Sequence, residues 1–259
     1  MTAFLSVQFP KSVELLADSA AYDEDGNVVG FERTIRTAKQ VPLAIAVRGA
    51  SRFALLFADG LCRQADQHGI DVFLQAAAVV AERIEDEVRH EDQNFDLAIG
   101  AFSPTRGPCH FRVHTYPTLP GFPAFRLNEM DTFVAAGTMF DPQELVRLGI
   151  WPVRGNPSVW AKTRAGEIFD IMRVRKGEPL PDTIGAPRYC IGGTVELASI
   201  TAEGVTVTRV RDYGDKVGSA IDPFAGAAAA LLQPPTRQQR RAAEREARKP
   251  HNQNNRSFA

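Results

Sequence analysis

The first residues of the chain have the types needed for a nucleophile that attacks amide bonds. Thr2 follows the initiator methionine, and aminopeptidases commonly remove a methionine that precedes threonine. Thr2 would then carry a hydroxyl and a free α-amine on one residue. Because such an amine acts as general base for its own hydroxyl, Thr2 alone supplies both nucleophile and base. We therefore predict acyl-transfer chemistry at the start of the chain.

Three further residues have the types that such a nucleophile needs beside it. Asp18 ends the second apolar segment of the chain and offers a carboxylate. Lys39, the one lysine of the stretch 12–161, offers a cation that lowers the pKa of the amine and stabilises the alkoxide. Gly49 lies where a strand passes into a helix, and its backbone N–H can stabilise an oxyanion. We predict Thr2, Asp18, Lys39 and Gly49 as the catalytic residues.

The elements that must position these residues begin with a hairpin. Residues 4–9 alternate between apolar and polar types, and a Pro-Lys-Ser turn at 10–12 separates them from an apolar run at 13–17. This pattern predicts two antiparallel strands. Since paired strands lie about 5 Å apart, the hairpin brings Asp18 back to the start of the chain.

The rest of the chain repeats an order of strands followed by paired helices. Hairpins that lead into consecutive helices favour antiparallel sheets, because parallel crossovers place single helices between single strands. Two such sheets, each with a helix pair on one face, predict an α+β fold with four layers, an αββα sandwich. The expected strands cover 41–47, 95–102, 109–114, 132–136, 189–200 and 205–210, and the expected helices cover 51–68, 70–88, 141–148 and 158–173.

Several segments together resemble a known family. Thr2, the segment Leu16–Ser19, and the segment Val47–Ala50 before a helix are similar to the N-terminal nucleophile hydrolases of the proteasome β-subunit and HslV type. Residues 133–138 resemble the Ser-Gly segment of that family, and residues 190–195 resemble its late Gly-Gly strand. The resemblance covers roughly residues 2–211, and the order of elements carries more of it than any one motif.

The resemblance implies an αββα fold, a threonine peptidase that needs no cofactor, a ring of identical subunits and an ATPase unfoldase as partner. It also implies that Thr2 is nucleophile and base, with Asp18, Lys39 and Gly49 around it. The interval from Asp18 to Lys39 is longer than in the family, so Arg33 or Arg36 is an alternative for the cation.

The chain departs from the family at supporting positions. Ala136 stands in place of a serine, and Arg188 and Ile191 stand where the family has an aspartate and a serine. These departures motivate a second hypothesis, in which the protein keeps the fold as a catalytically silent structural or assembly protein. A third hypothesis is that Thr2 acts on a small amide instead of a polypeptide.

Composition and charge limit the other possibilities. The formal net charge is −1, but residues 233–259 hold seven basic and two acidic residues, so nucleic acid is expected only as a partner of this basic tail. Three cysteines without metal-ligand spacing argue against disulfides and a zinc site. No apolar run reaches the roughly 18 residues of a membrane span. We expect a cytoplasmic protein with one domain over 1–232 and a tail over 233–259.

Overall fold

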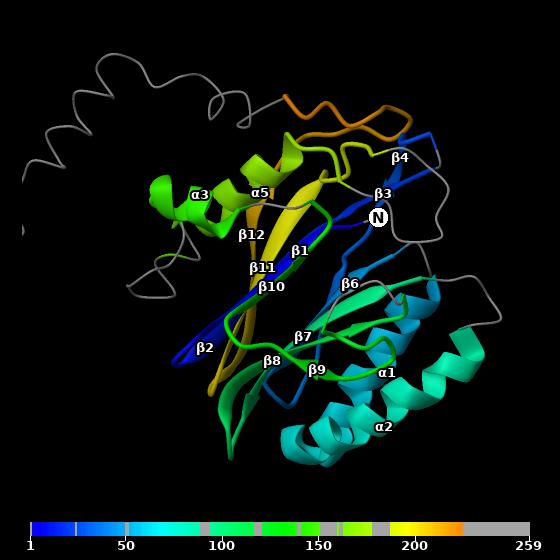
Figure 1. Ribbon diagram of the computed structural model, residues 1–259, viewed down its shortest axis with the longest axis vertical. Coiled ribbons are helices and arrows are strands. Elements are labelled where there is room, and N and C mark those ends of the chain that lie inside the picture. The colour runs from blue at the N-terminus through cyan, green and yellow to red at the C-terminus, as the bar shows by residue number, and fades with distance from the viewer. Residues whose placement is uncertain are drawn as a thin grey trace, which may run out of the picture.

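The computed structural model describes residues 2–23, 25–49, 52–88, 94–116, 121–138, 141–150, 160, 163–177 and 187–224. Two five-stranded antiparallel sheets lie face to face, and helices cover the outer face of each (Figure 1). This arrangement confirms the predicted αββα sandwich. The predicted tail at 233–259 and the end of the predicted domain at 225–232 lie outside the described residues.

The first sheet contains the predicted N-terminal hairpin in a central position. Its strand order is β10-β1-β2-β11-β12, so β1 and β2 have partners on both sides. Phe4 pairs with Ala17 and Phe9 pairs with Ser12, which confirms the hairpin and its turn. The strands are β1 (Phe4–Phe9), β2 (Ser12–Asp18), β10 (Phe133–Ala136), β11 (Thr194–Thr201) and β12 (Gly204–Asp212).

The second sheet has the order β5-β6-β7-β8-β9. A separate two-stranded ribbon, β3 paired with β4, follows β2 and lies beyond the end of the sandwich (Figure 1). The strands are β3 (Ala20–Tyr22), β4 (Val28–Phe31), β5 (Ile35–Thr37), β6 (Leu43–Arg48), β7 (Asp96–Ser103), β8 (Gly107–His114) and β9 (Asn128–Glu129).

The space between the sheets is filled largely by small and branched apolar side chains. Alternation along β6 directs Ala44 and Ala46 toward the first sheet, whereas Leu43 and Val47 pack against helices. Close approach of the sheets requires a glycine at position 100, because a Cβ there would lie 2.9 Å from Ile200 Cδ1. The sequence therefore fixes both the layer order and the separation of the sheets.

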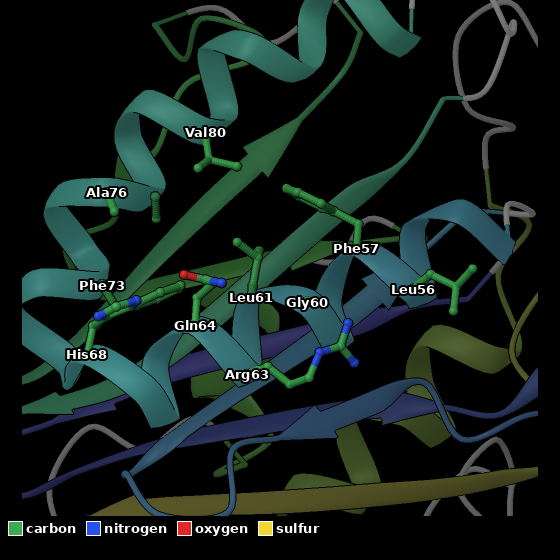
Figure 2. A pocket seen from close by; sticks show the side chains of 11 residues that line it. Leu56, Phe57, Gly60, Leu61, Arg63, Gln64, His68, Phe73, Ala76 and Val80 are labelled. Carbon is green, nitrogen blue, oxygen red and sulfur yellow. The ribbon is translucent and has the colours of Figure 1, made fainter.

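Helices α1 (Arg52–His68) and α2 (Ile70–Val88) cover the second sheet. Gly69 between them has φ of +79°, a conformation that glycine adopts readily. A groove of about 320 Å³ lies between the two helices, and Figure 2 shows Leu61, Phe73 and Val80 along it. Helices α3 (Pro142–Arg147) and α5 (Ala165–Arg173) cover the first sheet. No helix in the described ranges is long and apolar enough to cross a membrane.

One predicted strand boundary is wrong by five residues. The strand expected from residue 189 begins only at Thr194, because Gly193 has φ of +68° and turns the chain before the ladder starts. Of the helix expected over 158–173, residues Ala165–Arg173 form α5. Trp160 and Thr163 are helical as well, and the Arg164 N–H donates to the Trp160 carbonyl at 2.7 Å. The expected start of this helix lies outside the described residues, which leave out 158, 159, 161 and 162. The short strands β3, β5 and β9 carry too few residues for the periodicity to reveal them.

Candidate active site

The start of β1, the residues after β2 and the end of β6 meet at one end of the sandwich (Figure 1). A pocket of about 320 Å³ opens there, and Thr2 and Gly49 both line it. Thr2 is 6% exposed. The structure thus brings two of the predicted site residues to one pocket. Its other described lining residues are Ser19, Ala20, Ala21, Tyr22, Val29, Glu32, Thr34, Val47, Arg52 and Leu55.

Asp18 lies beside the start of β1, held by backbone groups. Its Oδ1 accepts the Ala3 N–H at 2.7 Å, and its Oδ2 accepts the Gly192 N–H at 2.9 Å. The Asp18 N–H in turn donates to the Ala3 carbonyl. Asp18 is fully buried, and the loss of water raises the pKa of its carboxyl to about 7, although both backbone N–H groups act to lower it. Asp18 therefore fixes the peptide bond between Thr2 and Ala3.

Gly49 is required by the backbone at the end of β6. Its φ is +131°, and a Cβ at this position would lie 2.8 Å from the Asn94 carbonyl oxygen. Both facts favour glycine over every other residue. Gly49 borders the same pocket as Thr2, which is the location that a donor to a substrate oxygen would need.

Lys39 does not lie at the pocket. It follows β5, is exposed, and its backbone N–H donates to the Asp66 carboxylate of α1 at 2.9 Å. Thr34, which does line the pocket, precedes β5, and the five residue steps from Thr34 to Lys39 span about 16 Å in a strand. Because of this distance, Lys39 does not act as the cation of the site in this geometry.

The two alternative cations are engaged elsewhere. Arg33 is half exposed and pairs with Glu196 at 3.2 Å. Arg36 pairs with Glu32 and with Asp59 of α1. Of the described residues that line the pocket, Arg52 is the one that carries a positive charge. At the position nearest Asp18 stands Thr34, whose hydroxyl donates to the Asp18 carbonyl at 2.7 Å.

A buried charged cluster, which the sequence analysis missed, lies next to this pocket. Arg48, the last residue of β6, faces the space between the sheets, and its Nη1 lies 3.9 Å from Asp96 Oδ2. Arg112 donates to both oxygens of Asp96, and Tyr116 donates to one of them. All four side chains are less than a tenth exposed. The signal available in the sequence was charge inside apolar strands, at the end of β6, the start of β7 and the middle of β8.

This buried charge cluster has two arginines and one aspartate, so it carries a formal net charge of +1. Its effect reaches the pocket, because the positive charge of Arg48 acts to lower the pKa of the Tyr22 hydroxyl and of the Cys190 thiol. Burial is the larger cause for both groups and raises their pKa. Buried cationic charge near an amine favours the neutral form of the amine, which is the form that acts as a base.

The positions where the chain departs from the family have structural roles. Ala136 pairs with Phe4 across β10 and β1. Thr138, two residues later, is buried with its Oγ1 3.7 Å from Cys190 Sγ. Arg188 donates to the Asp23 carbonyl, and the Ile191 carbonyl accepts from Arg173. In the described part of the chain, no three His, Cys, Asp or Glu side chains gather as a metal ion would require.

Comparisons with known proteins support the fold. No protein-family model matches the chain, and no curated protein matches it in sequence. Among solved structures the chain is similar to Anbu (ancestral beta-subunit) from Yersinia bercovieri, with a TM-score of 0.56 and 12% identity, over 80% of this chain and 86% of that chain. At this identity the likeness shows that the two chains share a fold and nothing further.

Proposed function

We propose that the protein is an N-terminal threonine hydrolase that cleaves amide bonds after removal of Met1. The observation that carries the proposal is that Thr2 and Gly49 line the same pocket while Asp18 fixes the peptide bond after Thr2. Thr2 attacks the carbonyl carbon, its amine takes the hydroxyl proton, and the Gly49 N–H stabilises the oxyanion. The amine proton then passes to the leaving nitrogen, and water hydrolyses the ester.

A polypeptide substrate is favoured over a small amide by a second pocket. This pocket, of about 390 Å³, adjoins the first and shares Ser19 and Glu32 with it. Apolar residues such as Val29 and Leu55 contribute to the first pocket, whereas charged residues such as Arg209 and Asp212 contribute to the second. A chain extended across Ser19 would occupy both, and a small amide would occupy one.

The assembly proposed with this activity is a ring of identical subunits in the cytoplasm, served by an ATPase unfoldase. The proposal rests on the resemblance to the proteasome β-subunit and HslV family and on the likeness to a protein described as an ancestral beta-subunit. The basic tail at 233–259 is proposed as a surface for an acidic partner or for nucleic acid.

One observation favours the silent structural or assembly protein as a second candidate. Both oxygens of Asp18 accept backbone N–H groups, and a neutral side chain, Thr34, donates to the Asp18 carbonyl. A threonine at this position supplies no positive charge to the amine of Thr2. In this candidate, Asp18 ties the first sheet together and the pocket has no reaction to perform.

The deciding experiment measures the intact mass of protein that begins with its native Met1 codon, before and after exposure to a β-lactone. The hydrolase is expected to lack Met1 and to gain one lactone adduct by opening of the lactone ring on Thr2. Thr2→Ala is expected to gain no adduct, while Ser19→Ala, a hydroxyl loss in the same pocket, is expected to retain it.

Either of two results would favour the silent protein. Retention of Met1 leaves Thr2 without the free amine that acts as its base. A free Thr2 that gains no adduct shows that the amine is present but the hydroxyl is not activated. Circular dichroism of each variant confirms that the fold is intact.

A further inference from the structure

Arg173, the last residue of α5, is a fully buried cation that makes four hydrogen bonds. Its Nη1 donates to the Ile191 carbonyl at 2.6 Å and to Asp215 Oδ2 at 2.9 Å. Its Nη2 donates to Asp215 Oδ1 at 2.7 Å and to the Asp222 carbonyl at 2.6 Å. The guanidinium also lies over the Tyr213 ring, 4.2 Å from its centroid. Such a bidentate, desolvated pair has a single geometry.

The Arg173–Asp215 pair holds the backbone at residues 191–193 from two sides. Arg173 takes the Ile191 carbonyl, and Asp215 Oδ2 accepts the Gly193 N–H at 2.8 Å. The packing leaves no room for a side chain between them, because a Cβ at Gly192 would lie 2.7 Å from Asp215 Oδ2. The orientation of the Gly192 peptide is therefore set by Arg173 and Asp215.

That peptide is the one that holds the candidate catalytic carboxylate. The Gly192 N–H donates to Asp18 Oδ2 at 2.9 Å, and Asp18 Oδ1 accepts the Ala3 N–H at 2.7 Å. A continuous series of hydrogen bonds and single peptide units thus runs from Arg173 to the residue that follows Thr2. Its members lie far apart in sequence, since Gly192 and Asp18 are 174 residues apart.

We propose that Arg173 is a positioning residue of the Thr2 site, which holds the Gly192 N–H on the Asp18 carboxylate through the Ile191 carbonyl and Asp215. The link to the reaction rests on the proposed hydrolase function. Arg173 itself touches neither Thr2 nor Gly49 in the contacts of the described residues, so its influence on the reaction is indirect. Loss of Arg173 would let the Gly192 peptide rotate and leave Asp18 Oδ2 without this donor.

Loss of the Gly192 donor would change the pKa of Asp18 in one direction. Burial raises the pKa of Asp18, and the Gly192 N–H opposes that effect. Among the described residues, the titratable groups that act electrostatically with Asp18 are the Tyr22 hydroxyl and the Cys190 thiol. The phenol and the thiol have pKa values raised by burial and stay neutral near pH 7. Without the Gly192 donor, Asp18 would take up a proton at a higher pH than in the native protein.

The test applies two measurements to the full chain and to three variants, which are Arg173→Met, Arg173→Lys and Glu167→Gln. Hydrogen exchange at the Gly192 amide reports the backbone directly and needs no reaction. The rate of β-lactone acylation between pH 5.5 and 9 reports the site. Glu167→Gln is the matched control, because Glu167 is a carboxylate of the same helix that pairs with Arg164. Arg173→Lys guards against a Met variant that does not fold.

The expected result is faster exchange at Gly192 in Arg173→Met, partial recovery in Arg173→Lys and no change in Glu167→Gln. Acylation of Arg173→Met is expected to slow by roughly 10²-fold, the scale of a 1 Å misplacement. The acidic limb of its pH–rate profile, where the rate falls at low pH, is expected to move up by about one pH unit. Native exchange at Gly192 in a folded Arg173 variant would overturn the proposal. If exchange at Gly192 becomes faster but the acidic limb of the pH–rate profile does not move, the link between Arg173 and the reaction is wrong. A wild-type protein that is never acylated would refute the proposed function, and exchange at Gly192 would still decide the positioning.

Discussion

Thr34 donates its hydroxyl to the backbone carbonyl of Asp18 over 2.7 Å and lines the same pocket as Thr2. The side chain next to the candidate nucleophile is therefore a neutral hydroxyl that is already bound to the backbone. Lys39, which the resemblance implies as the cation of the site, lies beyond the opposite end of β5.

Thr34→Lys is expected to accelerate β-lactone acylation of Thr2 roughly tenfold or more, because it places a cation where it lowers the pKa of the Thr2 amine. Lys39→Ala is the control and is expected to leave the rate unchanged, since Lys39 is exposed and distant from the pocket. The measurement is the rate of adduct formation by mass spectrometry. A large loss of rate in Lys39→Ala would contradict this placement.

Asp18→Asn is expected to destabilise the fold by about 1–3 kcal/mol, the cost of leaving a buried donor unpaired. An asparagine has one acceptor oxygen, so its amide nitrogen would face either the Ala3 N–H or the Gly192 N–H. Urea unfolding at pH 8 measures the change. Asp212→Asn, at an exposed carboxylate, is expected to change stability by less than about 0.5 kcal/mol, and equal effects of the two changes would sink the argument.

Gly49→Ala is expected to cost more stability than Gly69→Ala. Both glycines have positive φ, so both variants incur roughly 1 kcal/mol of backbone strain. A Cβ at Gly49 would also lie 2.8 Å from the Asn94 carbonyl oxygen, whereas nothing lies within 4 Å of one at Gly69. Thermal unfolding of the two variants compares their stabilities directly. A smaller loss of stability in Gly49→Ala would show that the backbone at the end of β6 can shift to accommodate a Cβ.

His110 is expected to make stability fall in acid. Burial lowers its pKa from 6.5 to about 4, and its Nδ1 lies 3.0 Å from the Ser6 hydroxyl between the sheets. The unfolded chain then binds the extra proton first, so the stabilisation is present above pH 6.5 and is lost as the pH falls toward 4. The total is about 3 kcal/mol at most.

The measurement for His110 is urea unfolding from pH 7 to pH 4. Asp18 and Glu14 have raised pKa values and act in the opposite direction, since their protonation stabilises the fold in acid. The comparison with His110→Gln, which keeps a polar group beside Ser6 without titrating in this range, isolates the histidine. Parallel pH curves for the two proteins would refute the prediction.

Asp96→Asn is expected to cost about 3–5 kcal/mol, because it leaves the buried Arg48 and Arg112 without their carboxylate. Glu129→Gln breaks the exposed pair with Arg106 and is expected to cost less than about 1 kcal/mol. Chemical unfolding measures both changes. A small effect at Asp96 would mean that water reaches the buried charge cluster.

The sequence predicted those elements whose residue pattern lies within one short segment of the chain. Alternation over residues 4–9 and 13–17 predicted the central hairpin, and helical periodicity with Gly69 predicted α1 and α2. The same local signals predicted that Asp18 returns to the start of the chain, as the Ala3 N–H bond shows.

The position of the site's cation and the supporting contacts could not be predicted from the sequence. Both depend on distances between residues that lie far apart in the chain. The β3–β4 ribbon takes up the chain between Asp18 and Thr34, so counting residues toward Lys39 overshoots the pocket. Arg173 and Asp215 are 42 residues apart, and their pairing depends on how α5 packs over the first sheet. A charged side chain in such a pair is positioned by its one partner. These residues therefore do not recur at the regular spacing that marks one face of a helix or strand.

The central position of β1 and β2 also determines when the site forms during translation. The ribosome makes this hairpin first, but its neighbours β10 and β11 come from residues 133–136 and 194–201. The Gly192 N–H that holds Asp18 emerges 174 residues after Asp18 itself. Asp18 therefore gains this partner only after residue 192 has been made, so the contacts around Asp18 are completed long after the hairpin itself.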